Sequence, residues 1–214
     1  MDDTTKVLLI GGASHLGKSS VAQLLAKQLS AKQVSTDKLA RHPGRPWQKR
    51  PFVVPPHVAE HFLTLSHDQL IASVMEHRRS MWPTIESVIR NHFEGRSAER
   101  LVLEGAGLLP ETVVGLKTKG VAAVWLIGDD RLQRSRIYRD SEYADAEPPA
   151  KAMIDKFLDR ERRFNRIITD EVLKRNLSYV EVVEDQAIDD VARRCLERAG
   201  LVDAEPNRRR RSKS

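Results

Sequence analysis

Short apolar runs and amphipathic segments alternate along the whole chain. Four apolar runs, rich in leucine and β-branched residues, predict buried strands because they lack the polar alternation of a half-exposed strand. A short further strand is predicted at 33–35, where β-branched Val34 follows the first amphipathic segment. The four apolar runs lie at 6–10, 101–103, 121–127 and 179–183.

Between these runs, apolar residues recur every three or four positions, which predicts amphipathic helices. Ser66 to Gln69 has the spacing of a capping box, and it predicts a helix start at this point. Pro83 is expected to kink or end that helix. The other predicted helices lie at 21–29, 85–93, 153–172 and 187–199.

Strands that alternate with helices predict an α/β fold. Because parallel strands need long crossovers, this order indicates a parallel sheet of about five strands with helices on both faces. Such sheets bind ligands at the carboxyl ends of their strands. Residues 38–64 contain five prolines after position 42, and we expect them to be irregular, without a long helix.

The length of 214 residues is enough to bury a sizeable core, and we expect one domain over residues 1–200. The formal net charge is +6, but Arg208–Arg211 and Lys213 supply five of those charges. We interpret residues 201–214 as a disordered basic tail, with an accessory arm for anions or RNA as the alternative. The charge is therefore no evidence that the folded domain coats nucleic acid.

Cys195 is the single cysteine, so no intramolecular disulfide is possible and a reducing compartment is expected. No apolar stretch approaches the roughly 18 residues that a membrane-spanning helix needs. We therefore expect a soluble cytoplasmic protein without a membrane partner. The oligomeric state is left open.

The segment from Gly12 to Ser19 matches the phosphate-loop pattern G-x-x-x-x-G-K-[ST] at every specified position. Its glycines allow backbone N–H groups to wrap a phosphate, at the positive end of the following helix. Lys18 is predicted to bridge the β- and γ-phosphates of ATP, and the Ser19 hydroxyl to bind Mg²⁺. The predicted nucleotide-binding residues are Gly12, Ala13, Ser14, His15, Leu16, Gly17, Lys18, Ser19 and Ser20.

Two carboxylates follow strands whose ends are expected near this loop. Asp37 comes directly after the strand at 33–35, and Glu104 ends the strand at 101–103. One carboxylate can accept the proton of an attacking hydroxyl, and the other can hold Mg²⁺ through water. The structural alternatives are a helix-capping or turn role for Asp37 and pairing with a structural arginine for Glu104.

Taken together, the phosphate loop, the Ser35-Thr-Asp37 segment and Glu104-Gly105 resemble small P-loop kinases. This group includes 2-phosphoglycerate kinase-like proteins, polynucleotide 5′-kinases and zeta-type toxins. The resemblance implies that Asp37 binds the acceptor hydroxyl and acts as base, and that Arg41 grips an acceptor phosphate. Arg41 departs from the usual Asp-x-x-Arg spacing, since it lies four residues after Asp37.

The resemblance also implies a mobile lid over about residues 131–150. Arg134 and Arg139 would then stabilise the transferring charge, and Arg131 would lie near the adenine. Arg45, in a proline-braced segment with Trp47, is a candidate for reading an anionic acceptor, with a plain surface loop as the equal alternative. A second basic set is interpreted as a solvated helix face, and comprises Arg160, Arg162, Arg163 and Arg166.

These features favour a kinase that moves the γ-phosphate of Mg-ATP onto a hydroxyl of a small, anionic metabolite. Lys18, Asp37, Glu104, Arg134 and Arg139 are the predicted catalytic residues. The first alternative is a polynucleotide 5′-kinase, for which the basic tail would supply nucleic-acid contacts. The second is a non-catalytic ATP-binding switch whose lid recruits a protein partner.

Overall fold

The computed structural model describes residues 5–39, 44–47, 54–116 and 118–203. Arg41 and the tail from 204 lie outside the described residues, so the roles predicted for them stay predictions. A five-stranded, all-parallel sheet forms the centre, in the order β2-β3-β1-β4-β5. This confirms the predicted α/β class. The strands are β1 Val7–Gly12, β2 Ala31–Ser35, β3 Arg100–Glu104, β4 Val121–Ile127 and β5 Tyr179–Glu181.

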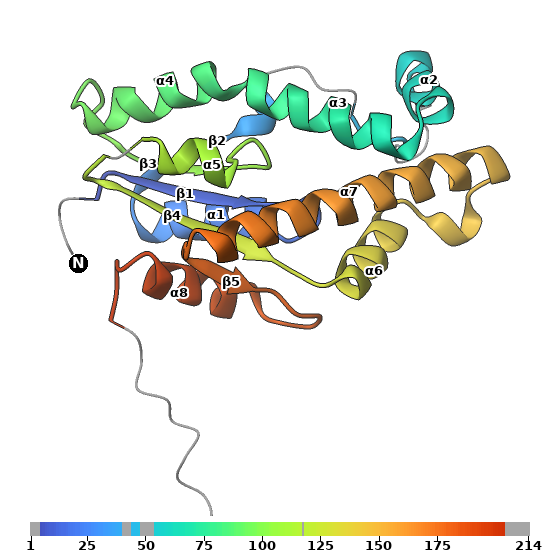
Figure 1. Ribbon diagram of the computed structural model, residues 1–214. Helices are drawn as coiled ribbons and strands as arrows, with labels where there is room; N and C mark the ends of the chain where they lie inside the picture. Colours follow the sequence, from blue (N-terminus) through green and yellow to red (C-terminus); the bar gives the residue numbers. More distant parts are fainter. Residues whose placement is uncertain (1–4, 40–43, 48–53, 117, 204–214) are drawn as a thin grey trace, which may run out of the picture.

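Helices cover both faces of the sheet, as the buried strands require (Figure 1). On one face α1, Lys18–Gln28, packs against α8, Ile188–Arg198. The longest helix, α7, packs on β4 from the other face. The helices of that face are α3 His67–Ser80, α4 Trp82–Phe93, α5 Pro110–Val114 and α7 Pro148–Lys174.

Local sequence signals explain where several helices begin. The capping box before α3 is present: the Ser66 hydroxyl accepts from the Gln69 N–H, and the Gln69 side chain accepts from the Ser66 N–H. Pro83 lies in the first turn of α4, so the helix before it ends as predicted. The prediction of irregular backbone over 38–64 is wrong for α2, Pro56–Thr64, because a proline at the first helical position is compatible with a helix.

An arm of the molecule extends beyond the end of the sheet (Figure 1). It is built from α2, α6 (Asp130–Asp140), the 3₁₀ turn η2 (Tyr143–Asp145) and the first half of α7. A second apolar cluster holds it together, formed by Trp47, Val58, Phe62, Leu70, Ile137, Met153, Ile154, Phe157 and Leu158. The predicted lid segment falls on α6, η2 and the start of α7, and its movement stays a prediction.

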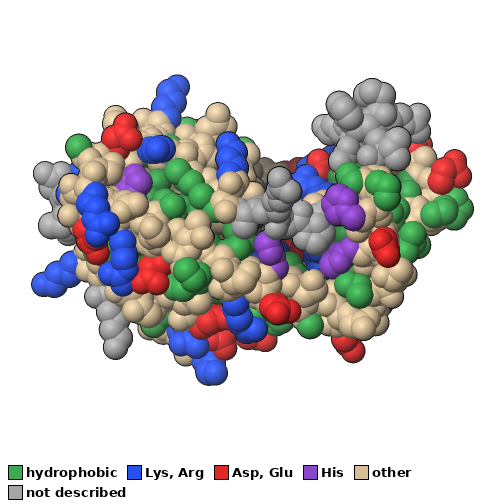
Figure 2. Space-filling model, turned by 90° about the horizontal axis from the view of Figure 1, so that it is seen from above, with side chains coloured by type: hydrophobic (Ala, Val, Ile, Leu, Met, Phe, Trp, Pro, Cys, Tyr) green, Lys and Arg blue, Asp and Glu red, His purple; other side chains and the backbone are tan. Residues whose placement is uncertain are grey.

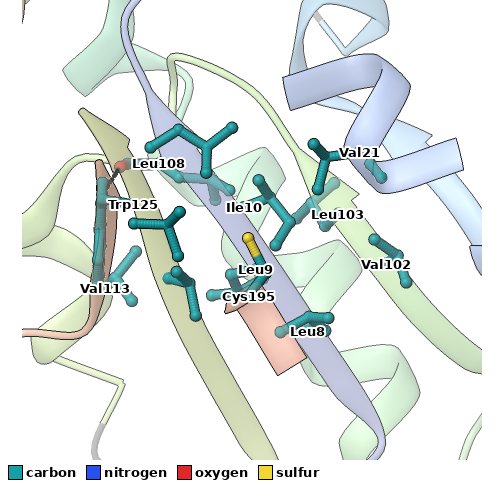
Figure 3. Close-up of a cluster of buried hydrophobic side chains, with 14 of the residues drawn as sticks. Leu8, Leu9, Ile10, Val21, Val102, Leu103, Leu108, Val113, Trp125 and Cys195 are labelled. Carbon is teal, nitrogen blue, oxygen red and sulfur yellow. Dashed lines mark hydrogen bonds between the residues drawn. The ribbon is translucent and has the colours of Figure 1, made fainter. Parts of the chain in front are cut away.

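The main core is centred on β1, every residue of which is buried. The Trp125 ring packs beside it, and its indole N–H donates to the Leu108 carbonyl at 3.0 Å (Figure 3). Burial raises the pKa of Cys195 to about 12, so this thiol is protonated at neutral pH and fills the core. Within the described part of the chain, no helix is long and apolar enough to cross a bilayer.

The location of the main core predicts at which positions the loss of an apolar side chain lowers the free energy of unfolding. Leu9→Ala, in β1, removes a side chain that is 1% exposed and is expected to lower the free energy of unfolding by about 2–5 kcal/mol. Leu173→Ala makes the same chemical change at a position that is 53% exposed, and should stay within about 0.5 kcal/mol. Urea denaturation measures both. Equal effects would contradict this location of the core.

Candidate functional site

The phosphate loop connects the end of β1 to the start of α1. Gly12 has a φ of 127°, and a Cβ there would lie 2.3 Å from the Leu126 carbonyl oxygen. Gly17, directly before α1, has a φ of 88°. Both positions therefore require glycine. The first turn of α1 contains no acidic residue, so its positive end is free to attract an anion.

Lys18 folds back across the inside of this loop. Its ammonium donates to the Ala13 carbonyl at 2.7 Å, and the side chain is buried. Burial lowers the pKa of Lys18, while the nearby carboxylates of Glu104 and Asp37 raise it. The loop thus holds a buried ammonium group against its own backbone.

Ser19 and Glu104 meet at the carboxyl edge of the sheet, where β3 lies beside β1. The Ser19 hydroxyl donates to Glu104 Oε1 at 3.1 Å. A hydroxyl and a carboxylate are the hard oxygen ligands that Mg²⁺ prefers. Among the described residues, no group of three or more His, Cys, Asp or Glu forms a cation cage. The Ser19 hydroxyl and the Glu104 carboxylate could hold a Mg²⁺ ion that takes its other ligands from phosphate oxygens and water.

A small cavity, here called the inner cavity, lies between the phosphate loop, α3 and α7. Its volume is about 100 Å³. Six charged side chains contribute to its lining, and four of them are basic. Figure 2 shows Lys, Arg and His side chains around a hollow on the face that carries α3 and α7. The charged and imidazole groups of the lining are Lys18, Asp37, Arg45, His61, His77, Arg78, Arg160 and Glu161.

Glu161 is the buried carboxylate that organises this cavity. Its Oε2 accepts from the Ser14 N–H of the loop at 3.1 Å, and its Oε1 accepts from Arg160 at 2.9 Å. Arg78 lies 3.7 Å from the same oxygen. Burial alone would raise the pKa of Glu161, but the two guanidiniums and the Ser14 N–H outweigh it and lower the pKa to about 2.

Both arginines are held in place by aromatic rings. The Arg78 guanidinium lies 3.4 Å from the Phe164 ring centroid, and that of Arg160 lies 4.6 Å from the Phe157 centroid. Burial lowers the pKa of Arg78 to about 10, so the group stays charged at neutral pH. Its Nη1 is buried and has no hydrogen-bond partner within the described structure. This donor is positioned for an acceptor on a ligand.

A larger cleft, here called the outer cleft, lies on the opposite side of the loop. Its volume is about 620 Å³, and it is bounded by α6 and by the turn between β5 and α8. Arg136 donates to the His15 carbonyl at 3.1 Å and so connects α6 to the phosphate loop. Apolar groups of Val182 and Ile188 contribute to the far wall. A cleft with basic and apolar walls beside a phosphate loop suits a nucleotide.

The structure brings most of the predicted residues together. Gly12 ends β1, residues 13–17 form the connecting loop, and Lys18–Ser20 begin α1, with Ser19 beside Glu104. Asp37, in the 3₁₀ turn η1 (Thr36–Lys38), and Arg45 line the inner cavity. Arg139 lines the outer cleft. Arg131 and Arg134 are exposed on α6 and line neither space, so their roles stay predictions.

Four residues of the site were missed by the sequence analysis: Arg78, Arg136, Arg160 and Glu161. The interpretation of the α7 arginines as a solvated face is wrong for Arg160, which is 7% exposed. A signal was present, because Glu161 occupies a position of the apolar stripe that contains Phe157, Phe164 and Ile168. A charged residue inside such a stripe must be paired or functional.

The described fold is similar to solved kinase structures. A gluconokinase from Sinorhizobium meliloti 1021 is 17% identical, with 92% of this chain and 93% of that chain covered and a TM-score of 0.51. The two chains share this fold over nearly their whole lengths.

Two further structures align at lower TM-scores. A shikimate kinase from Aquifex aeolicus vf5 is 15% identical, with 89% and 93% of the two chains covered and a TM-score of 0.45. A deoxyadenosine kinase from M. mycoides is 12% identical, with 87% and 95% covered and a TM-score of 0.46. No protein-family model matches the chain, and no curated protein matches it.

The pairing of Glu161 predicts a pH-dependent stability. Glu161→Gln leaves Arg78 and Arg160 without their anion, and should cost about 3–5 kcal/mol at pH 7. Because the pKa of Glu161 lies near 2 in the fold and near its ordinary 4.5 in the unfolded chain, the unfolded state takes up the proton first on acidification. The stability difference between wild type and variant should therefore shrink as the pH falls from about 5 towards 2.

Chemical denaturation at a series of pH values measures this difference. Glu76→Gln, at an exposed position of α3, is the matched control and should behave like wild type throughout. A difference for Glu161→Gln that stays constant with pH would contradict the ion pairing.

Proposed function

We propose that this protein is a phosphotransferase that moves the γ-phosphate of Mg-ATP to a hydroxyl group of a small, anionic metabolite. The observation that carries the proposal is the division of the phosphate loop between two spaces. Ser14 and Lys18 line the inner cavity, whereas His15, Gly17 and Ser20 line the outer cleft. A phosphate chain bound along this loop has its nucleoside on one side and its terminal phosphate towards the other.

The inner cavity offers the groups that phosphoryl transfer to an alcohol needs. Asp37 lines it and couples electrostatically to Lys18. In the proposed step, the acceptor oxygen forms a bond to the γ-phosphorus while the bond from that phosphorus to the bridging oxygen breaks, and ADP leaves. The hydroxyl proton passes to the Asp37 carboxylate, and Lys18 stabilises the charge on the transferring group.

The charge and size of the inner cavity support an anionic acceptor of low molecular weight. Arg78 and Arg160 share one buried carboxylate, which leaves a positive charge and the unpartnered Arg78 Nη1. A carboxylate or phosphate on the acceptor would satisfy both. A volume of about 100 Å³ favours a small metabolite over the end of a polynucleotide.

The outer cleft would take the nucleoside of ATP, with Arg136 and Arg139 near the phosphates. Both arginines line this cleft, and Arg136 already contacts the loop backbone. Ser19 and Glu104 would hold Mg²⁺, which neutralises charge on the phosphate oxygens when it is bound. Closure of α6 over the cleft would exclude water from the transfer.

Asp37→Asn tests the proposed base. The variant should bind Mg-ATP within about twofold of wild type, because Asp37 lines the inner cavity and not the outer cleft. Its transfer of labelled γ-phosphate to a fractionated metabolite extract should fall by about 10²-fold or more, the range of general-base catalysis. Calorimetry measures the binding.

Lys18→Ala is the blank for this assay, and Asp170→Asn, exposed on α7, is the matched control with wild-type transfer. Equal loss of binding and transfer in Asp37→Asn would contradict a role as base. Binding of ATP by wild type with no transfer to any fraction would contradict the kinase and favour an ATP-binding switch.

Arg78→Lys tests the anionic acceptor. Lysine keeps a charge beside Glu161 but loses the guanidinium fork, so the acceptor KM should rise by about tenfold while the ATP KM stays constant. Arg79→Lys makes the same change one residue away, where the side chain is 59% exposed, and should alter neither constant. Steady-state kinetics with the acceptor purified from the active fraction measures both, and an unchanged acceptor KM would contradict the role of Arg78.

A further inference from the structure

One carboxylate oxygen connects three separate parts of the molecule. Asp140 Oδ2, at the end of α6, lies 2.7 Å from Arg45 Nη1, 3.2 Å from His15 Nε2 and 3.3 Å from Trp47 Nε1. His15 belongs to the phosphate loop, and Arg45 and Trp47 belong to the segment 44–47 beside the inner cavity. Sequence separations of 93 to 125 residues are bridged at this single atom.

These contacts determine the protonation states of Asp140 and His15. Burial opposes the ionised form of Asp140, but the hydrogen bond from His15 and the charge of Arg45 outweigh it, and its pKa lies below the usual value. Because an ionised carboxylate only accepts, Nε2 of His15 carries the proton. Burial and the charge of Arg45 lower the pKa of His15, so the ring is neutral at pH 7.

Packing reinforces these hydrogen bonds. The His15 ring lies 5.9 Å from that of Trp47 and 6.0 Å from that of Phe157, measured between centroids. Trp47 packs edge-on against Phe157 at 4.7 Å. The His15 side chain is 7% exposed, so it cannot shift without moving Trp47.

The cluster lies where the two ligand spaces meet. Asp140 and His15 line the outer cleft, whereas Arg45 and Phe157 line the inner cavity. A surface ion pair between Arg45 and Asp140 would contribute little by itself, because the Arg45 side chain is 50% exposed. The shared acceptor instead gives the two spaces a common wall.

We propose that Asp140 is a positioning residue that couples nucleotide binding on the phosphate loop to the arrangement of Arg45 and Trp47 at the acceptor cavity. The inference rests on the proposed function, since it assumes that a nucleotide occupies the loop. Binding of phosphate oxygens to the loop N–H groups fixes the His15 backbone. His15 then fixes Asp140, and Asp140 holds Arg45 and Trp47 over the cavity. By reciprocity, an acceptor that contacts Arg45 strengthens nucleotide binding.

Trp47 provides the readout, and no acceptor is needed. Mg-AMPPNP, a non-hydrolysable ATP analogue, is titrated into the full-length protein until binding is saturated, and tryptophan fluorescence is recorded. We expect a change in emission that Trp47→Phe abolishes, since Trp82 and Trp125 lie outside the cluster. Calorimetry on the same samples records nucleotide binding independently.

Asp140→Asn should remove most of the Trp47 signal at saturating nucleotide while calorimetry still shows binding. His15→Asn breaks the same connection from the loop side and should also remove most of the Trp47 signal. Asparagine tolerates the left-handed φ of 62° at this position but cannot reach Asp140. Asp145→Asn removes the same charge from an exposed position of η2 and should keep the full signal. If Asp140→Asn does not fold, His15→Asn carries the test.

The outcomes separate this inference from the proposed function. A full Trp47 signal in both Asp140→Asn and His15→Asn would overturn the coupling. Nucleotide binding by wild type without any Trp47 signal would overturn the coupling and leave the proposed function intact. A wild-type protein that does not bind Mg-AMPPNP would overturn both.

Discussion

A buried carboxylate joins the parts of this molecule that have to act together. The helix α7 contributes residues both to the main core and to the second apolar cluster, and Glu161 lies on it between the two. Its carboxylate accepts a hydrogen bond from the Ser14 N–H of the phosphate loop and forms ion pairs with Arg78 and Arg160. A buried ion is stable only when its partners are correctly placed, so this residue fixes the loop, α3 and α7 relative to one another.

The parallel sheet supplies the second constraint. In the order β2-β3-β1-β4-β5, the ends of β1 and β3 are neighbours, and the register pairs Ile10 with Glu104. Glu104 therefore reaches Ser19, and Asp37 follows the end of the adjacent strand β2. The carboxyl edge of the sheet brings together the phosphate loop, the two oxygens proposed to hold Mg²⁺ and the candidate base.

The predictable part of the site is the part encoded by local sequence. The loop Gly12–Ser19 needs its glycines for backbone reasons, and Asp37 and Glu104 follow recognisable strands, so their positions near one another could be predicted while their roles stay predictions. Arg78 and Glu161 are 83 residues apart in the sequence and meet because α3 packs against α7. No local sequence pattern predicts that these two helices are neighbours. Their positions inside apolar stripes were a visible signal.

The predicted lid segment, 131–150, shows a different limit. The arginines of α6 recur over a short stretch, and only the rotation of the helix decides which of them face inward. Arg136 and Arg139 line the outer cleft, whereas Arg131 and Arg134 do not. That rotation is set by the packing of Leu132 and Ile137 into the two clusters, which depends on α2 and α7. Residue type alone therefore identified the segment but not its inward-facing members.

The central claim is that the phosphate loop separates a nucleotide cleft from an acceptor cavity. A crystal structure of the protein with Mg-AMPPNP tests it most directly. The account predicts the nucleoside beside Arg136 and Val182, Mg²⁺ beside Ser19 and Glu104, and the terminal phosphate facing Asp37. A nucleoside placed in the cavity between Arg78 and Glu161, or a triphosphate bound away from Lys18, would contradict it.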